Sequence, residues 1–544
     1  MTYFLNHYTL KYTPLSPLHI GADESYEPGN YVIDDEAGAL YSFDNQAAMA
    51  GLSDSDKQHL LAIVNGKPDD SMLTKVQAFF HNHREKLLAF ANSPIPTASG
   101  IKALYEKRIG KTAQNEGHGK RVINKLEIER TFYNPVNSKP LLPGSSIKGA
   151  IRTALLDGLN QGKPLERGEK YKYLQERLLE GKFATDPLRL VSIGDAEWHG
   201  KADKPACKIQ FAVNRKRKPV MRNGKLVQSQ AEASNLYQLL ECVAPNHYQG
   251  FSGSLTLHNT QSIRQDDCKL PKQHLHWTVK DIANACNRFY RDLFLQELNA
   301  MKARNYLKLD WLEQMEQLLE QLNADNVFLL RVGRHSGAEA LTLNKIRSIK
   351  IMQGKRERPK YEDKPLTWWF AADEITNKQA LLPFGWVLVE IDAKSRDQKV
   401  QQWLENNHNE LTAWMQAQLN RQSELKQQAD LRKRQEQEKR LAEQQREEED
   451  RIKQKAEQQR LANLSPIEQE IEIFLKSFQV QEHDTRLLQE LEKGRWQAED
   501  AQIVAQKVKA LMEQTGKWMP DFTGTNKTKV KMKTRSEKVL QYLE

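Results

Sequence analysis

The chain has 544 residues, enough for roughly two to four domains, and its formal net charge of +10 at pH 7 favours a polyanionic partner. Its four cysteines lie far apart without a Cys-x-x-Cys pair, which argues against a disulfide framework or a cysteine-rich zinc site. No apolar run approaches the roughly 20 residues that span a bilayer, and the first residues lack a signal-peptide pattern, so we expect a soluble cytoplasmic protein.

The first 395 residues have a globular composition in which strand and helix patterns are mixed without regular alternation. The predicted elements are, in chain order, a strand over 9–20, a hairpin over 30–43, helices around 57–64 and 72–91, and buried strands over 327–332 and 386–391. This mixture predicts an α+β fold rather than a doubly wound sheet. We divide it into two modules, residues 1–200 and residues 201–395.

The composition changes sharply after residue 395, and from 398 to 463 nearly every residue is Gln, Glu, Lys, Arg, Leu or Ala, with no Pro or Gly. This predicts a charged helical linker over 396–464, either a solvated single helix or a partly disordered spacer, because its apolar residues lack heptad spacing. A capping box and a proline at Ser465-Pro466-Ile467-Glu468 then predict a small helical domain over 465–544, which has a basic end.

The most informative stretch is residues 140–156, where a short apolar run ends at a Pro-Gly turn signal and a helical pattern follows. Ser145 and Ser146 are placed to cap this helix. Lys148 and Arg152 are four residues apart and share one of its faces. Free backbone N–H groups, two hydroxyls and two cations would therefore converge where a phosphate can bind.

Gly149 lies between the two cations of this stretch. Because it has no side chain, it would let another backbone approach the helix closely. The alternative for the whole stretch is an ordinary capped amphipathic helix with a solvated basic side.

Two further segments, residues 102–125 and 201–225, are strongly cationic. Clustered positive charges repel one another, which favours pairing with phosphate, and nearby aromatic residues suit stacking on unpaired bases. The alternative is a pair of solvated, disordered loops. The RNA contacts predicted from these segments are Lys120, Arg121, Arg215, Lys216 and Arg217.

A glycine-rich turn at residues 331–337 follows a predicted buried strand. Its two glycines and the cationic residues Arg331, Arg334 and His335 can present N–H groups and positive charge to a phosphate. The spacing is not that of a Walker A loop, and a simple tight turn explains the local pattern equally well.

Evidence for catalysis is sparse, because neither H-E-x-x-H nor G-x-S-x-G is present. Asp34 and its acidic neighbours could bind a divalent cation, although an acidic turn between strands is the commoner case. Asp195 ends a strand-like run and is interpreted as a turn or cap residue. We expect no metal ion or cofactor.

With these features in place, the chain resembles the RAMP superfamily of CRISPR RNA-binding proteins, in particular the backbone-capping subunit of the Csm (type III-A) interference complex. The most specific match is the stretch at residues 142–152. The other stretches that resemble the family are residues 17–21, 191–195, 330–337 and 383–387. The resemblance covers roughly residues 1–395 and does not extend to the remainder.

The resemblance implies RRM-like (ferredoxin-like) modules whose inserted loops grip RNA, and it adds His19 and Gly21 to the expected RNA contacts. It implies one copy at the end of a subunit filament, near the 3′ end of a guide RNA and in reach of target RNA. The implied partners are the neighbouring RAMP backbone subunit, the small subunit of the Csm complex and recruited host nucleases that mature the guide.

The sequence and the resemblance together leave three possible functions. The first is a CRISPR RNA-binding structural subunit without chemistry of its own. The second is a Mg²⁺-dependent endoribonuclease that uses Asp34 and Asp195, since backbone paralogues of the family cleave target RNA with an aspartate near this position; the capping subunit is regarded as non-catalytic. The third is a scaffold whose basic tail meets partners or nucleic acid.

Overall fold

The computed structural model describes residues 4–111, 114–116, 120–122, 126–227, 236–245, 247–260, 263, 269–321, 326–352, 357–393, 401–402, 404 and 409–544. It forms two compact units, residues 1–430 and residues 431–544, and each is described by itself. No helix within these ranges is long and apolar enough to cross a membrane.

The first sheet of the larger unit is built around β1 (Leu5–Pro14), and all of its strand pairs are antiparallel. Strand β1 pairs with β15 (Phe251–His258) and with β21 (Trp386–Ile391). The outer strands are β9 (Val191–Ile193), β10 (Glu197–Trp198) and β16 (Val327–Arg331). Packed around this sheet are α6 (Gly144–Asn160), α9 (Val279–Cys286), α10 (Asp292–Lys302) and α11 (Leu309–Gln321).

The second sheet has the strand order β2-β8-β14-β11-β19-β20. Its strands are β2 (Gly21–Tyr26), β8 (Ile128–Thr131), β14 (Tyr237–Val243), β11 (Cys207–Lys216), β19 (Thr367–Ala372) and β20 (Leu382–Pro383). Only the β14–β8 pair is parallel among these described strands. The α+β class predicted from the sequence is confirmed.

The predicted division into residues 1–200 and residues 201–395 does not separate the two sheets. In the first sheet β1 lies between two strands from the second half of the chain. In the second sheet β8 pairs with β14, again across the predicted boundary. The modules are therefore interleaved, because long-range strand pairing links the two halves.

A smaller sheet carries the predicted hairpin, with β3 (Tyr31–Asp34), β4 (Ala39–Ser42) and β5 (Ile95–Pro96). Four helices follow this hairpin in the chain: α1 (Asn45–Gly51), α2 (Asp54–Val64), α3 (Asp70–Asn82) and α4 (Arg84–Leu88). Aromatic side chains of the hairpin and of α3 share one buried core. We call residues 31–96 the hairpin subdomain.

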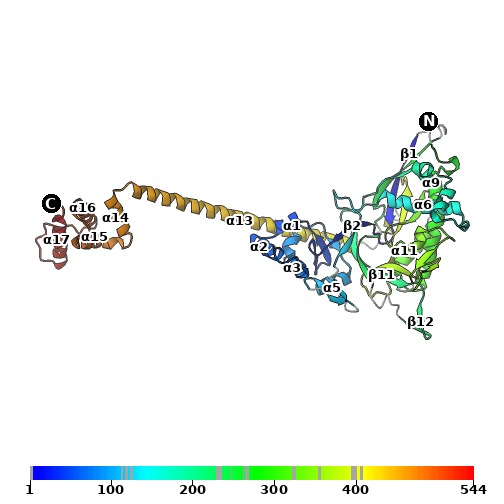
Figure 1. Ribbon diagram of the computed structural model, residues 1–544, viewed down its shortest axis with the longest axis horizontal. Helices are drawn as coiled ribbons and strands as arrows, with labels where there is room; N and C mark the ends of the chain where they lie inside the picture. Colours follow the sequence, from blue (N-terminus) through cyan, green and yellow to red (C-terminus); the bar gives the residue numbers. More distant parts are fainter. Residues whose placement is uncertain are drawn as a thin grey trace. The chain divides into compact units, whose positions relative to one another are not determined.

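The long helix α13 (Asn409–Ala462) begins against this hairpin subdomain (Figure 1). The Trp414 indole N–H donates to the carbonyl of Ala37 at 2.9 Å, and the Gln422 amide donates to that of Ala91 at 2.8 Å. Leu425 packs on the subdomain's core. The predicted linker is thus helical over most of its length, but its first turns belong to the folded larger unit.

Other described elements of the larger unit are also short. They include α5 (Ser99–Arg108), α7 (Tyr171–Leu178) and three two-stranded ribbons: β6 (Gln114–Glu116) with β7 (Lys120–Val122), β12 (Val220–Arg222) with β13 (Lys225–Val227), and β17 (Ile349–Ile351) with β18 (Lys360–Glu362).

The smaller unit ends in a helical domain with its own apolar core, as predicted. Its helices are α14 (Pro466–Leu475), α15 (His483–Glu492), α16 (Ala498–Gln514) and α17 (Lys527–Leu540) (Figure 1). The capping box formed by Ser465 and Glu468 is present, with the proline at the first helical position. The basic end of the chain, for which the sequence predicted only charge, forms α17.

An extended segment at residues 15–20 joins the two main sheets. Toward the first sheet, the Leu15 N–H donates to Trp386 at 2.8 Å, and the carbonyl of Pro17 accepts from Gly385 at 3.0 Å. Toward the second sheet, the backbones of Leu18 and Val243 exchange two hydrogen bonds of 3.2 and 2.7 Å. We call residues 15–20 the joining segment.

Gly333 packs so closely against the joining segment that a side chain at this position would clash with it. Gly333 has a φ of +84°, and a Cβ there would lie 2.4 Å from the carbonyl oxygen of His19. We expect Gly333→Ala to lower the free energy of unfolding by about 2 kcal/mol or more, as measured by urea denaturation. Gly168→Ala is the matched control, since Gly168 has a φ of +80° but open space around it. Equal losses in the two variants would contradict the steric argument.

Candidate nucleic-acid interface

Backbone hydrogen bonds connect the stretches that resemble the family. The carbonyl of His19 accepts from the Arg334 N–H at 2.8 Å, which joins the first stretch to the glycine-rich turn. Phe132 links that first stretch to residue 141, because its N–H donates to Ile20 and its carbonyl accepts from Leu141. The separated sequence motifs therefore meet around the joining segment.

Helix α6 begins differently from the prediction. Pro143 occupies the N-cap position and provides no side-chain cap, so Ser145 and Ser146 lie within the first turn and do not cap the helix. The carboxylate of Asp195 accepts from the Gly144 N–H at 2.7 Å. Asp195, interpreted from the sequence as a turn or cap residue, thus caps α6 in place of Ser145 and Ser146. It takes up one of the N–H groups that the sequence predicted to be free for phosphate.

The two cations of this helix have different environments. Arg152 donates to the carboxylate of Asp186 at 2.7 Å and to the Gln175 amide oxygen at 3.1 Å. Lys148 is half-buried, and burial lowers its pKa, an effect that Asp186 opposes. The two predicted phosphate contacts therefore differ, because Arg152 already has a carboxylate partner within the protein.

Gly149 leaves the backbone of α6 uncovered on one face of the helix. A Cβ at this position would meet no atom within 4 Å, so no described part of the chain makes the close approach that a glycine here allows. Ser145, one turn earlier, is also exposed. The exposed face, flanked by Lys148, is therefore available to a molecule from outside.

His19, Arg334 and His335, which were expected as RNA contacts from separate stretches, come together beside the first residue of β2, Gly21. His19 is fully buried; its Nδ1 lies 2.8 Å from the carbonyl oxygen of Glu241, and its Nε2 has no partner among the described atoms. Burial lowers the pKa of His19, so the ring is held neutral.

The other two members of this group differ in exposure. Arg334 is partly exposed and forms an ion pair with Glu129. His335 has a φ of +63°; its ring stacks on Trp369 with centroids 4.5 Å apart, and its Nε2 lies 2.8 Å from the Gln238 amide oxygen. Arg334 is the member that can meet a phosphate.

Two predicted contacts are wrong because the side chains are buried. Arg331 is 2% exposed, forms an ion pair with Glu297 and donates to the Phe384 carbonyl at 3.0 Å. Arg215 is 4% exposed and donates to the carbonyl of Ile375 at 2.8 Å. Both cations hold the fold together, since releasing either would leave buried acceptors unpaired.

The remaining predictions from the cationic segments have mixed outcomes. Arg217 forms an ion pair with Glu339 and lies over the ring of Trp368 at 4.5 Å, so it too is structural. Lys216 is half-buried in β11. The side chains of Lys120 and Arg121 lie outside the described residues.

A cation held between two aromatic rings was not predicted from the sequence. Arg130 lies 3.8 Å from the ring centroid of Tyr133 and 4.6 Å from that of Tyr26. Beside it, burial raises the pKa of Glu241 to about 6, while its oxygens accept from the Tyr26 hydroxyl and the Thr131 N–H. Arg130 and Glu241 line a pocket of about 270 Å³. The aromatic residues near the first cationic segment were the available signal.

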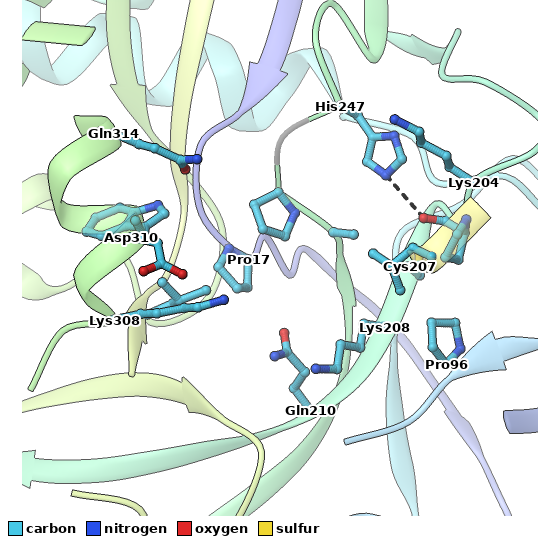
Figure 2. A pocket seen from close by; sticks show the side chains of 16 residues that line it. Pro17, Pro96, Lys204, Cys207, Lys208, Gln210, His247, Lys308, Asp310 and Gln314 are labelled. Atoms are coloured by element: carbon cyan, nitrogen blue, oxygen red, sulfur yellow. Dashed lines mark hydrogen bonds between the residues drawn. The ribbon is translucent and has the colours of Figure 1, made fainter. Parts of the chain in front are cut away.

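A second pocket, of about 230 Å³, lies where Pro17 of the joining segment meets β11 and the start of α11 (Figure 2). Lysines 204, 208 and 308 line it, together with Asp310 and several prolines. Lys208 forms an ion pair with Asp373 at 2.7 Å. Lys204 lines both pockets, which makes it the member of the second cationic segment best placed to meet an anion.

Asp34 is buried at the end of β3, with 3% exposure. Its carboxylate forms an ion pair with Arg421 of α13 and accepts from the Glu36 N–H at 3.1 Å. Among the described residues, no three His, Cys, Asp or Glu side chains gather in a way that could hold a metal ion. The Asp34 carboxylate is thus already engaged by the protein.

The pH dependence of stability offers a test of the His335 environment. Burial lowers the pKa of His335 to about 3, and the positive charge of Arg334 adds to this effect. As the pH falls below about 6.5, the unfolded chain takes up a proton that the folded chain does not, so stability is lost. Between pH 7.5 and 5.5 we expect His335→Gln to lose about 1 kcal/mol less unfolding free energy than the parent, as measured by urea denaturation. Identical losses would contradict the assignment.

Comparison with known proteins places the chain in a family. A model of the RAMP superfamily matches residues 11–335. A chain from the cryo-EM structure of a Csm-crRNA-target RNA ternary complex in a type III-A CRISPR-Cas system is 16% identical with a TM-score of 0.41, covering 71% of this chain and 100% of that chain. The crystal structure of T. onnurineus Csm5 is 14% identical with a TM-score of 0.40, covering 70% of this chain and 99% of that one. No curated protein sequence matches. Because the family model matches more than half of its length, the chain belongs to the RAMP superfamily.

Proposed function

We propose that this protein is an RNA-binding structural subunit of a type III-A (Csm) CRISPR effector complex, where it caps the backbone at the 3′ end of the guide RNA. Membership of the RAMP superfamily supports the RNA-binding role. The partners in this proposal are guide RNA, target RNA, the neighbouring RAMP backbone subunit, the small subunit and the nucleases that trim the guide.

The observation that carries the RNA-binding role is the open face of α6 at Gly149. A helix backbone without a side chain at its surface lets a sugar–phosphate chain approach to van der Waals contact. The exposed Ser145 can donate a hydrogen bond to that chain, and Lys148 supplies a positive charge. Such contacts bind the nucleic acid backbone and carry no sequence information, which suits a guide of variable sequence.

Other cations near the joining segment extend this surface in the proposal. Lys204 lines both pockets, and Arg334 stands at the glycine-rich turn with 39% of its side chain exposed. Each is placed so that a phosphate could neutralise it without disturbing a buried ion pair, unlike Arg331.

Filling the open face should block RNA while sparing the fold. Gly149→Leu adds a side chain into empty space and replaces a poor helix former by a good one, so the variant should be at least as stable as the parent. We expect its affinity for single-stranded RNA to fall about tenfold or more, as measured by fluorescence anisotropy at fixed salt. Gly149→Ala should have a smaller effect in the same direction.

Two controls accompany this experiment. Ala442→Leu likewise adds an apolar side chain at an exposed helical position, in α13, and should leave RNA affinity unchanged. Lys148→Ala should lower the slope of log affinity against log salt by about 0.7 to 1, whereas Arg152→Ala should not, because Arg152 is already paired with Asp186. Unaltered RNA binding by Gly149→Leu would refute this proposal.

We also propose that the subunit has no nuclease activity of its own. The alternative, a Mg²⁺-dependent endoribonuclease using Asp34, requires a carboxylate that can bind a metal ion, yet this one is paired with Arg421. We expect purified protein with Mg²⁺ to leave labelled single-stranded RNA intact on a denaturing gel. Cleavage that Asp34→Asn abolishes, with an unchanged circular dichroism spectrum, would establish the enzyme instead.

A further inference from the structure

The helical domain at residues 465–544 has a strongly uneven distribution of charge. Residues 507–538 contain nine Lys or Arg and three Asp or Glu. Residues 465–500, by contrast, contain four Lys or Arg and nine Asp or Glu. The basic part comprises the second half of α16, the loop after it and most of α17. The positive charge of the domain is therefore concentrated in this part of its sequence, although its total charge is close to balanced.

Some of these cations stabilise the domain. The buried carboxylate of Asp484 pairs with Lys517 at 2.8 Å and with Arg535 at 3.2 Å. Lys538 at the end of α17 pairs with Glu492 at 2.7 Å. These ion pairs tie the loop and α17 to α15.

Three other lysines have no such role. Lys527, Lys529 and Lys531 are exposed in the first turns of α17, and none forms an ion pair with a described acidic residue. Lysines here face the positive end of the helix dipole and one another, so they oppose the formation of this helix. Their clustering is accounted for if an anion from outside neutralises them.

Aromatic rings lie beside the same cations. Lys529 places its ammonium 5.7 Å from the ring centroid of Phe522, and Lys509 places its own 5.4 Å from that of Trp518. Both rings are only half-buried, and a hydrogen bond of 3.0 Å from the Met519 N–H to the Ser536 hydroxyl holds their loop against α17. Lys509 also pairs with Glu513 at 4.0 Å, whereas Lys529 forms no ion pair with a described acidic residue. Half-exposed rings next to exposed lysines are what unstacked bases and their phosphates require.

We propose that the start of α17 and the loop carrying Trp518 and Phe522 form a second nucleic-acid-binding surface, specific for single strands. The lysines bind successive phosphates, and the rings stack on bases that a duplex would keep inside. This surface lies in the smaller unit, so it is distinct from the α6 face and does not depend on the function proposed for the larger unit.

The test is a triple substitution in the full-length chain, Lys527→Gln, Lys529→Gln and Lys531→Gln. The matched control is Arg434→Gln, Lys439→Gln and Lys455→Gln, which removes the same charge from exposed positions of α13. Anisotropy with labelled 20-nucleotide RNA and DNA single strands is measured across a salt series, in the parent and in the Gly149→Leu background. We expect the α17 triple variant to lose about tenfold in affinity and about two units of salt slope, and the control to lose little.

Three outcomes would overturn the proposal: the α17 triple variant behaving like its control, duplex DNA of equal length binding as tightly as single strands, or Phe522→Ala leaving single-strand affinity unchanged. A loss for RNA alone would identify RNA as the ligand, and an equal loss for both would identify any single strand. Loss with the triple variant but not with Gly149→Leu would uphold this surface and refute the α6 site, so the two proposals fail separately.

Discussion

The fold depends on the joining segment at residues 15–20, whose backbone is hydrogen-bonded to both main sheets. Peptide groups buried between two sheets need partners, and here Trp386 and Val243 provide them from opposite sides. The indole N–H of Trp311 adds a third connection by donating to the carbonyl of Leu15 at 2.6 Å. The two sheets cannot shift relative to each other without breaking these bonds, so the loops attached to them are held in fixed positions.

This constraint explains why the cations of the larger unit divide into two classes. Those in the strands, such as Arg331 of β16 and Arg215 of β11, are buried and engaged by carboxylate or carbonyl oxygens. Those at the rim, such as Lys204 and Arg334, keep access to the surface. A high positive net charge therefore overstates the number of cations that are available to an anion from outside. The partners of each cation within the protein decide which ones remain available.

Features encoded locally could be predicted from the sequence, and those created by distant contacts could not. The hairpin around Asp34 and the capping box at Ser465 follow from neighbouring residues alone, and both are present. The burial of Arg331 requires Glu297, 34 residues away, and the docking of α13 requires a subdomain more than 300 residues earlier. At the candidate site the sequence indicated the α6 stretch but assigned the cap to Ser145 and Ser146. The actual acceptor, Asp195, is distant in sequence and is brought there by a strand.

The open face of α6 at Gly149 has a consequence for the lifetime of the free protein. A glycine inside a helix costs about 1 kcal/mol relative to alanine, and nothing else in the described chain covers this position to offset that cost. In the function proposed above, RNA covers it, and a ligand present at 100 times its dissociation constant stabilises the folded state by about 2.7 kcal/mol. A subunit without guide RNA would then unfold and be degraded more readily than one in a complex. The supply of guide RNA would in this way set how much of the free protein persists in the cell.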